Sequence, residues 1–352
     1  MLLTIVAFIL ILGLLILAHE LGHYVTARLA GVKVEEFGIG YPPRIFGIKR
    51  GETIYSLNWI PLGGFCRLLG EEDPSEPRSL ATKPAWVRLI VLGAGSFMNA
   101  VLPIVLLTIA FMIPRDVRVG DIFIDEVALN SPAVEAGIEA GDRLLAVNGQ
   151  EVENIGDVIY EIHMSLGGDT TLSLENTAGV ERTVTVVPRW DPPEGEGAVG
   201  ITMSMANIEV ISQSYPFWEA VPKAGSTLWE TFTLIRNEVA SWFARGAAPE
   251  VAGPVGIFQL TGEASEAGPS YLVQFAAFLS LNLAFVNLFP IPGLDGGRII
   301  FVLIEVARRG KRVAPRTEGL IHLAGFVLLL GLILVITVAD IIRVAEGRPL
   351  IE

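Results

Sequence analysis

His19-Glu20-Leu21-Gly22-His23 directly follows residues 1–18, which carry no charge. The stretch has the pattern H-E-x-x-H. On a helix, residues four apart lie on one face, so the two imidazoles can bind one metal ion, and neutral imidazole suits zinc. Glu20 lies beside them, where it could accept a proton from a water molecule that the metal activates. A zinc motif at the end of an uncharged helix is expected in or at a membrane.

The composition is that of a membrane protein. The chain has 352 residues, of which 51% are hydrophobic, and its mean hydropathy is +0.55. These values indicate several membrane spans together with a soluble part. The only cysteine, Cys66, excludes an intramolecular disulfide and a multi-cysteine metal site, and we interpret it as a small packed residue. The net charge of −13 argues against nucleic acid as a partner.

Four long uncharged runs predict four transmembrane helices. They comprise residues 1–18, 89–113, 267–294 and 319–339. At 1.5 Å per residue each can cross a hydrocarbon layer of about 30 Å, the first only just. We interpret the first run as a retained span, because it lacks a basic start and cleavage at its end would destroy the zinc motif.

The charges between these runs predict the orientation. Residues 28–88 hold nine Lys/Arg and seven Asp/Glu, and residues 298–318 hold six and two. Residues 115–266 hold eight Lys/Arg against twenty-four Asp/Glu. By the positive-inside rule the two basic connections are cytoplasmic. The acidic middle segment and both termini are then extracytoplasmic.

Residues 1–114 are expected to form the first half of a membrane core. Between its two spans, residues 32–69 alternate as β-strands do, with a turn at Lys49-Arg50-Gly51-Glu52. We expect a small sheet at the cytoplasmic face of the membrane, whose open edge could pair with an extended peptide; a purely structural hairpin is the alternative. In the second span, Asn99 either packs against a neighbouring helix or faces the site.

Residues 115–205 are predicted to be a separate, extracytoplasmic α+β domain. The order Ser131-Pro132-Ala133, Ala136-Gly137, Gly141-Asp142 and Val147-Asn148-Gly149 resembles PDZ domains. Such domains bind peptide ends by strand addition. In the permuted strand order the candidate peptide-binding residues are Val199, Gly200 and Ile201. A ligand-free, steric role that excludes bulky substrates is the alternative.

Residues 206–269 are expected to hold an amphipathic helix and a linker. The helix, residues 213–245, is rich in aromatic residues typical of membrane interfaces: Phe217, Trp218, Trp229, Phe232, Trp242 and Phe243. We predict that it lies on the outer membrane surface, with packing against the PDZ-like unit as the alternative. Gly253-Pro254 is expected to break the chain before the third span.

Residues 270–352 are expected to form the second half of the membrane core. Pro290 and Pro292 must open the third span before Asp295, the sole charge of this run, and an intramembrane Asp is a candidate site residue. Both the first and third spans run inward, so Asp295 should reach the depth of His19 and His23. Two His and one carboxylate leave a fourth tetrahedral position open, as in catalytic zinc sites. The alternative is that Asp295 merely caps the next helix. We interpret His322, near the start of the fourth span, as a packing residue, with a further metal ligand as the alternative.

The motifs together resemble the site-2 protease family of intramembrane zinc metalloproteases, in particular bacterial members with one PDZ domain. They are His19-Glu20-x-x-His23, Pro61-Leu62-Gly63-Gly64, the PDZ-like insert, Gly253-Pro254-Val255-Gly256 and Asn287-x-x-Pro290-x-Pro292-x-Leu294-Asp295-Gly296. The resemblance implies that His19, His23 and Asp295 bind one Zn²⁺ and that Glu20 is the catalytic acid and base. It also implies that Asn287, with Gly63 and Gly64 of the sheet, contacts the substrate. The chain departs from the family at Gly95-Ser96, where Gly-Pro is common, and at Gly293.

The predicted fold is therefore an α-helical polytopic membrane protein with four transmembrane helices, a small membrane-associated β-sheet and an inserted PDZ-like domain. The resemblance implies a protein of the bacterial cytoplasmic membrane that cleaves single-span membrane proteins, such as an anti-sigma factor or remnant signal peptides. Its active site would lie near the cytoplasmic side of the bilayer. The alternatives are a catalytically silent membrane scaffold that binds peptide C-termini through the PDZ-like domain, and a zinc transporter.

Overall fold

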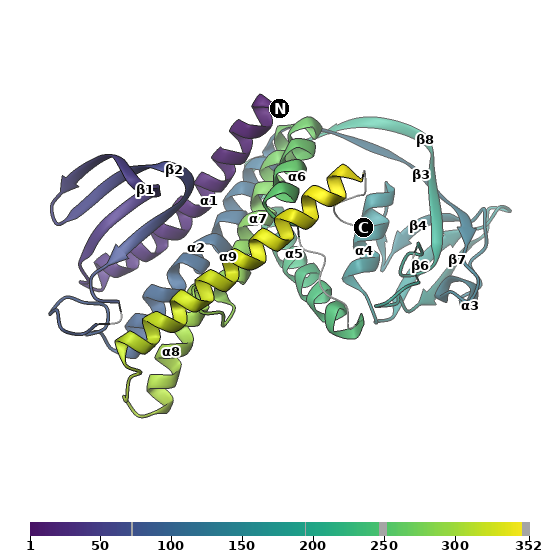
Figure 1. Cartoon of the computed structure of the whole chain (residues 1–352). Helices are drawn as coiled ribbons and strands as arrows, with labels where there is room; N and C mark the ends of the chain where they lie inside the picture. Colours follow the sequence, from purple (N-terminus) through teal and green to yellow (C-terminus); the bar gives the residue numbers. More distant parts are fainter. Residues whose placement is uncertain (72, 194, 246–251, 347–352) are drawn as a thin grey trace. The chain divides into compact units, whose positions relative to one another are not determined.

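The structure is a computed structural model that describes residues 1–71, 73–193, 195–245 and 252–346 (Figure 1). The chain divides into two compact units. We call Met1–Phe111 together with Glu250–Glu352 the membrane unit, and Met112–Pro249 the inserted unit. Each is described by itself.

Four helices of the described chain are long and apolar enough to cross a membrane, and all belong to the membrane unit. They are α1 (Leu2–Leu29), α2 (Ala85–Met112), α7 (Pro269–Leu288) and α9 (Pro315–Ala345). Each contains or overlaps one of the predicted runs. A polytopic membrane protein that also carries β-sheets is thus supported, and the zinc motif lies on α1 itself.

The third uncharged run does not form one helix. Helix α7 ends at Leu288, residues 289–294 are irregular, and α8 (Asp295–Ala307) begins at Asp295 (Figure 1). Pro290 and Pro292 explain the break, because proline lacks the N–H that a helix interior requires. The opening of the third span before Asp295, which Pro290 and Pro292 predicted, is therefore present, and it begins at residue 289.

A further helix, α6 (Pro254–Ala267), occupies the stretch in which only a chain break was expected. Gly253 is its N-cap and Pro254 its first residue. Proline suits a first helical position, because the N–H it lacks has no partner there. The dipeptide Gly253-Pro254 therefore starts a helix instead of only ending the preceding segment.

The small predicted sheet consists of the antiparallel strands β1 (Val34–Arg50) and β2 (Thr53–Leu68). Two segments of β2 pair with the start of β1. Residues 34–39 of β1 lie between them, with residues 64–68 on one side and residues 54–57 on the other. Residues 64–68 thus form an edge of the sheet. The base of the sheet shares a buried apolar cluster with α1, α2 and α8, comprising Ala27, Val32, Val34, Leu68, Leu80, Val91, Leu92 and Val302.

The inserted unit is built on a six-stranded sheet with the order β7-β6-β4-β3-β8, in which β5 pairs with β4. Its elements are β3 (Arg115–Val127), α3 (Pro132–Glu135), β4 (Arg143–Val147), β5 (Gln150–Glu151), α4 (Ile155–Met164), β6 (Thr170–Glu175), β7 (Glu181–Val186), β8 (Ile201–Gln213) and α5 (Phe217–Arg245). Ile122, Leu144, Val158 and Leu172 lie in its buried core. The unit is α+β as expected, and its assignment as a PDZ domain stays a prediction.

The predicted boundary at residue 205 differs from the structure. Strand β8 continues to Gln213 and pairs with β3 as far as Arg115. Helix α5 then packs on α4: Tyr160 donates a hydrogen bond to Glu230 (2.6 Å), and the Asn237 amide donates to the His163 and Met164 carbonyls. Residues 206–269 are therefore no separate linker, because β8 and α5 belong to the inserted unit and α6 to the membrane unit.

For the aromatic helix α5, the sequence left open a position on the membrane surface or packing against the α+β unit. These contacts favour packing against the α+β unit. Phe217, Trp218 and Trp229 are nevertheless exposed, so one face of α5 remains apolar. The side chains of Trp242 and Phe243 lie outside the described residues.

An ion-pair cluster holds α8 against α2. Arg88, with 6% of its surface exposed, donates to Glu305 (2.5 Å), and Arg312 donates to the other carboxylate oxygen (3.0 Å). Burial acts to raise the pKa of Glu305, but its hydrogen bonds to Arg88 and Arg312 outweigh burial and lower the pKa below the ordinary value. Because α8 begins at Asp295, this cluster also fixes the helix that carries that residue.

We expect Glu305→Gln to lower the free energy of unfolding by about 2 kcal/mol at pH 7, because it leaves Arg88 buried without a counter-charge. When folding lowers the pKa of a carboxylate, the ionised carboxylate stabilises the folded state at every pH above its ordinary pKa. This stabilisation is lost as the pH falls through the lowered pKa of the folded state. The difference between the two proteins, measured by thermal melting in detergent, should therefore vanish in acid. Glu35→Gln, which removes more exposed pairs with Lys33 and Arg67, should change stability by less than about 0.5 kcal/mol. Equal melting of all three proteins at pH 7 would contradict the role of this cluster.

Candidate metal centre

His19 and His23 project from one face of α1 toward α2, and both are buried. They are one turn apart, as their spacing in the sequence predicts. The side chain of His19 meets Asn99 and that of His23 meets Val91, so α1 and α2 run antiparallel. The two imidazoles thus face the middle of the membrane unit.

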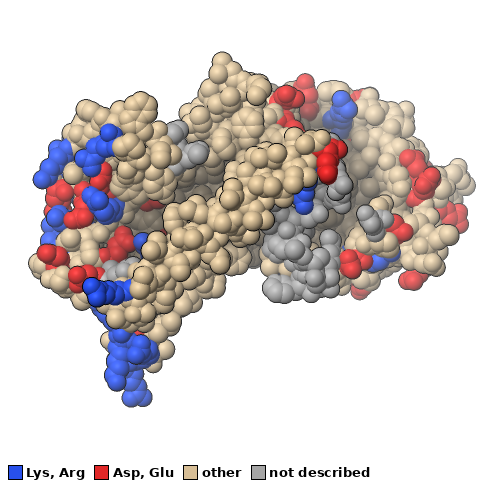
Figure 2. All heavy atoms as spheres, in the orientation of Figure 1, with Lys and Arg blue, Asp and Glu red and all other residues tan. Residues whose placement is uncertain are grey.

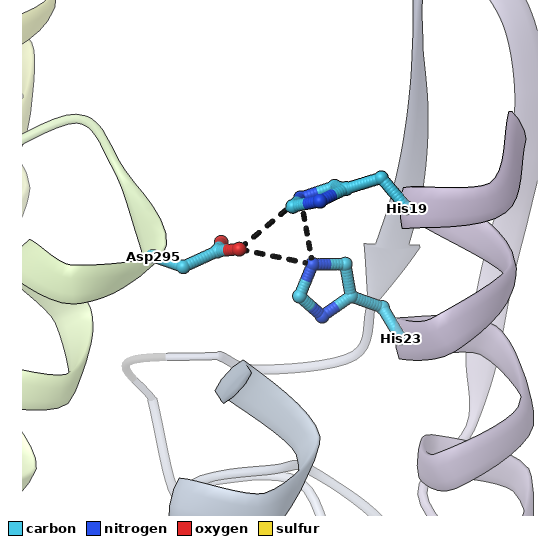
Figure 3. A group of neighbouring side chains, drawn as sticks. All are labelled: His19, His23 and Asp295. Atoms are coloured by element: carbon cyan, nitrogen blue, oxygen red, sulfur yellow. Dashed lines mark hydrogen bonds and ion pairs between the residues drawn. The ribbon is translucent and has the colours of Figure 1, made fainter. Parts of the chain in front are cut away.

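The start of α8 brings Asp295 to the two imidazoles (Figure 3). Oδ2 of Asp295 lies 3.1 Å from Nε2 of His19 and 3.3 Å from Nε2 of His23. The two Nε2 atoms are 3.2 Å apart. Within the described residues these three form the one group of His, Cys, Asp and Glu side chains whose ligand atoms lie close enough to share a metal ion.

The triangle of ligand atoms has the size that zinc requires. Zinc lies about 2.0–2.1 Å from nitrogen and oxygen ligands, and tetrahedral directions then separate two ligands by about 3.3 Å. The measured sides are 3.1, 3.2 and 3.3 Å. Three corners of a tetrahedron are therefore supplied, and the fourth faces a cavity.

Hydrogen bonding favours a lone pair on the His23 nitrogen that faces the centre. Nδ1 of His23 lies 2.8 Å from the carbonyl oxygen of Val91, to which it must donate. A neutral imidazole with its proton on Nδ1 carries a lone pair on Nε2. That lone pair points at the Asp295 carboxylate, an arrangement that a cation between them stabilises. The residues present therefore fit a zinc ion.

Asn99 takes the corresponding position at His19. It is fully buried, its amide nitrogen is 3.4 Å from Nδ1 of His19, and its Oδ1 has no hydrogen-bond partner among the described residues. The two ends of an amide have nearly the same shape. Turning the Asn99 amide by 180° lets Oδ1 accept a proton from Nδ1 of His19 and leaves the Nε2 lone pair for the metal. Of the two interpretations that the sequence left open for Asn99, the structure favours the one in which it faces the site.

Gly95 allows α2 to approach the imidazoles. A Cβ at this position would lie 2.3 Å from Nε2 of His23 and 2.7 Å from Nε2 of His19. Such contacts are shorter than real Cβ atoms show, so a larger residue would displace the ligands. The two imidazoles therefore require glycine at position 95, whereas the sequence indicated only close packing between helices.

Helix α8 begins at Asp295, but the Asp295 side chain does not cap it. Its N-cap is Leu294, and no side chain there accepts a capping hydrogen bond. The irregular segment before it is held by α9: the Gly293 N–H donates to Nδ1 of His322 (3.0 Å), and His322 packs on Phe301. His322 is thus no member of the metal group and supports the segment that presents Asp295.

The three ligands line an open cavity of about 890 Å³ within the membrane unit. Glu20 lines it beside the imidazoles, as do Gly63 and Gly64 of β2 and Asn287 near the end of α7. The structure therefore brings every candidate site residue of the membrane unit to one cavity. Phe326, Leu329, Leu330 and Ile333 of α9 give the same cavity an apolar wall.

The edge of β2 borders this cavity. Residues 64–68 line it, and Gly64 packs so closely on α1 that an added Cβ would lie 2.9 Å from Ile16 and 3.4 Å from Glu20. The Leu68 N–H donates to Glu71 (3.4 Å). This N–H therefore points away from β1 and out of the sheet.

The other predicted peptide-binding residues belong to the inserted unit. Val199 is 2% exposed and packs in the core, and its carbonyl accepts from the Ala133 N–H. Gly200 has φ +82° and its N–H donates to the Gly197 carbonyl. Ile201 begins β8, whose outer side is an edge of the sheet. Only Ile201 and the strand that it starts offer an open edge for a peptide.

The chain is similar to known metalloproteases. Residues 7–332 match Peptidase family M50. The chain is 36% identical to a putative zinc metalloprotease of Clostridium acetobutylicum, over 96% of this chain and 97% of the relative. It is 29% identical to the zinc metalloprotease RasP of Geobacillus kaustophilus, over 96% and 97% of the two chains. It is 28% identical to the regulator of sigma-W protease RasP of Bacillus subtilis, over 97% and 98%.

Gly95→Ala is expected to reduce bound zinc from about one ion per chain to a small fraction, because the new methyl group occupies the space of the imidazoles. Gly93→Ala is the matched control, since nothing lies within 4 Å of a Cβ at that position on the same helix. Alanine there should be neutral or slightly stabilising. Metal analysis of the purified proteins measures both. Full zinc occupancy in Gly95→Ala would show that α2 does not confine the ligands.

Asn99→Leu is expected to weaken zinc binding by about 10- to 100-fold, because groups that orient a metal-binding histidine have effects of that size. Asn282→Leu on α7 provides the control, because the Asn282 amide donates only to its own helix, at the Phe278 carbonyl. Competition with a chelator of known affinity gives both zinc affinities. Similar affinities in the two variants would rule out the His19 contact as the cause.

Proposed function

Because the chain belongs to peptidase family M50, the site-2 protease family, and is a zinc metalloprotease, we propose that it cleaves single-span membrane proteins in or near their transmembrane segments. The observation that carries this proposal is the meeting of His19, His23 and Asp295 in a cavity formed by membrane-spanning helices. In this proposal the three side chains hold one zinc ion.

Each residue of the centre has a distinct task. When bound, zinc supplies a Lewis acid that acidifies water and polarises the peptide carbonyl. The Glu20 carboxylate takes the proton of the attacking water and delivers it to the nitrogen of the leaving amine. Asn99 and the Val91 carbonyl orient the imidazoles from behind. The apolar wall of α9 restricts bulk water.

The edge of β2 is the proposed docking position for the substrate backbone. A transmembrane helix hides its peptide bonds in internal hydrogen bonds, so it must unwind before cleavage. The unwound strand can pair with residues 64–68, where Gly63 and Gly64 offer no side chain to obstruct it. Asn287 lines the same cavity and can hold the substrate backbone through its amide.

Substrate docking then bears on the catalytic base. Residues 64–68, which an added strand would pair with, line the same cavity as Glu20, and Gly64 packs against the Glu20 side chain. A docked strand is therefore brought within reach of the Glu20 carboxylate.

The proposed location is the bacterial cytoplasmic membrane, with the centre near its inner face. The support is the excess of Lys and Arg in the connections 28–88 and 298–318. Both termini and the inserted unit are then extracytoplasmic. A relative in Bacillus subtilis is named a regulator of sigma-W protease. We accordingly propose an anti-sigma factor or a remnant signal peptide as the substrate.

The inserted unit is proposed to act as a PDZ-like module that binds peptide ends at the open edge of β8. Its sheet order, with β8 outermost, supports strand addition there. A catalytically silent scaffold that used only this module would have no need for the geometry of the metal centre. The two functions are separated by one substitution.

Glu20→Gln should leave about one zinc ion per chain and lower cleavage of a co-expressed single-span substrate by at least about 10³-fold, since the amide cannot accept the proton. Glu263→Gln is the control, a carboxylate of α6 that bonds only Gln259 and lies outside the cavity. Immunoblotting of the substrate and metal analysis provide the readouts. Unchanged cleavage by the Glu20 variant would favour the scaffold and a second protease.

A further inference from the structure

A second cavity of the membrane unit, about 590 Å³, lies where the last turn of α1 meets the β1–β2 turn. It is lined by Tyr24, Arg28, Arg50, Gly51, Glu52 and Tyr55. None of these residues lines the cavity of the metal centre. Figure 2 shows Lys and Arg side chains gathered over the β1–β2 hairpin.

The cavity is rich in positive charge. Its one carboxylate, Glu52, is held by both ends of the Arg78 guanidinium at 2.7 and 2.9 Å. Arg78 first, and then Arg28 and Lys33, hold the pKa of Glu52 below its ordinary value. Within the described residues no carboxylate forms an ion pair with Arg28 or Arg50. Two guanidinium groups therefore remain to bind an anion.

The tyrosines add a further donor. Their hydroxyl oxygens are 2.5 Å apart, so one hydroxyl hydrogen lies between them, and Arg28 donates to the Tyr24 oxygen at 3.2 Å. The second hydroxyl hydrogen must then point elsewhere. Phe37 packs against both rings, with centroids at 5.3 and 6.4 Å, and fixes this wall of the cavity. The lining thus offers several donors and hardly any free acceptor.

The cavity also lies at a membrane boundary. Arg28 is in the last turn of the spanning helix α1 and, because α1 and α2 are antiparallel, is level with the first turn of α2. There Trp86 is 65% exposed, as tryptophans at membrane interfaces are. Leu21, Val25 and Leu29 form an exposed apolar stripe on the same end of α1. Fatty acyl chains can lie along this stripe below the arginines.

We propose that Arg28, Arg50 and the Tyr24–Tyr55 pair bind the phosphodiester headgroup of an anionic phospholipid. A guanidinium group can donate two parallel hydrogen bonds to the oxygens of one phosphate, whereas a lysine ammonium acts as a point charge. The two arginines of this donor-rich cavity therefore suit a phosphate group. The lipid joins the end of α1 to the β1–β2 turn. This site is independent of the metal centre and of the proposed reaction.

The test uses the full chain in detergent, titrated with phosphatidylglycerol and followed by native mass spectrometry. Arg28→Gln combined with Arg50→Gln should weaken lipid retention by about 30-fold, from a factor of about five for each arginine at an anionic surface. Arg308→Gln combined with Lys311→Gln removes the same charge from the exposed α8–α9 connection and should change retention by less than about twofold. Zinc content reports whether each variant is folded. If the glutamine pair does not fold, Arg28→Lys with Arg50→Lys should still weaken retention about fivefold, since lysine cannot bind phosphate with a planar fork.

Two ligand comparisons identify the source of the phosphate. Phosphatidylcholine should be retained much more weakly than phosphatidylglycerol, and inorganic phosphate at about 10 mM should not displace the lipid, because it lacks acyl chains. Equal loss in the two glutamine pairs, equal retention of both lipids, or displacement by phosphate alone would each overturn the proposal.

Discussion

Three atoms that carry lone pairs meet in the membrane unit: Nε2 of His19, Nε2 of His23 and Oδ2 of Asp295, separated by 3.1 to 3.3 Å. Such atoms repel one another unless a cation or shared protons lie among them. A carboxylate and two imidazoles within a membrane are also costly unless they are paired. This constraint accounts for much of the nearby fold, since the break after α7, the support by His322 and the ion pair of α8 all serve to deliver Asp295.

The ligands are oriented by α2, which supplies no ligand itself. Its Val91 carbonyl and Asn99 amide contact the outer nitrogens of the two imidazoles, and Gly95 between them leaves space for the rings. A backbone carbonyl of a helix can accept such an extra hydrogen bond because oxygen has two lone pairs. The site therefore constrains the α2 sequence at Gly95 and Asn99, whereas the Val91 carbonyl belongs to the backbone and any residue there would supply it.

The sequence predicted the parts of the site that depend on local spacing. The H-E-x-x-H pattern fixes two ligands on one helix, and the prolines before Asp295 indicate an opened helix. The expectation that the first and third spans run in the same direction indicated that Asp295 would lie near the two histidines, and the distances agree with it. What local patterns could not predict are contacts across distant segments: Asn99 facing His19, Glu305 pairing with Arg88, and β8 continuing along β3 to Gln213. Gly253-Pro254 predicted a break but not the helix α6 that starts there, because the same dipeptide can end one element and begin another.

The position of the β1–β2 hairpin explains why a zinc centre among helices can act on a peptide bond at all. Hydrolysis needs an accessible carbonyl, and a helix in a bilayer conceals every one of its carbonyls. In the proposed mechanism, the edge at residues 64–68 supplies new hydrogen-bond partners for the backbone of an unwound substrate, within the cavity that Glu20 and the three candidate ligands line. Gly64 is what permits this edge to lie against α1, since any side chain there would push β2 away from Ile16 and Glu20. In the proposed mechanism, strand capture therefore takes place on a short stretch of β2 that packs against the helix of Glu20, so a substitution in that stretch is expected to change which peptide bond is cleaved.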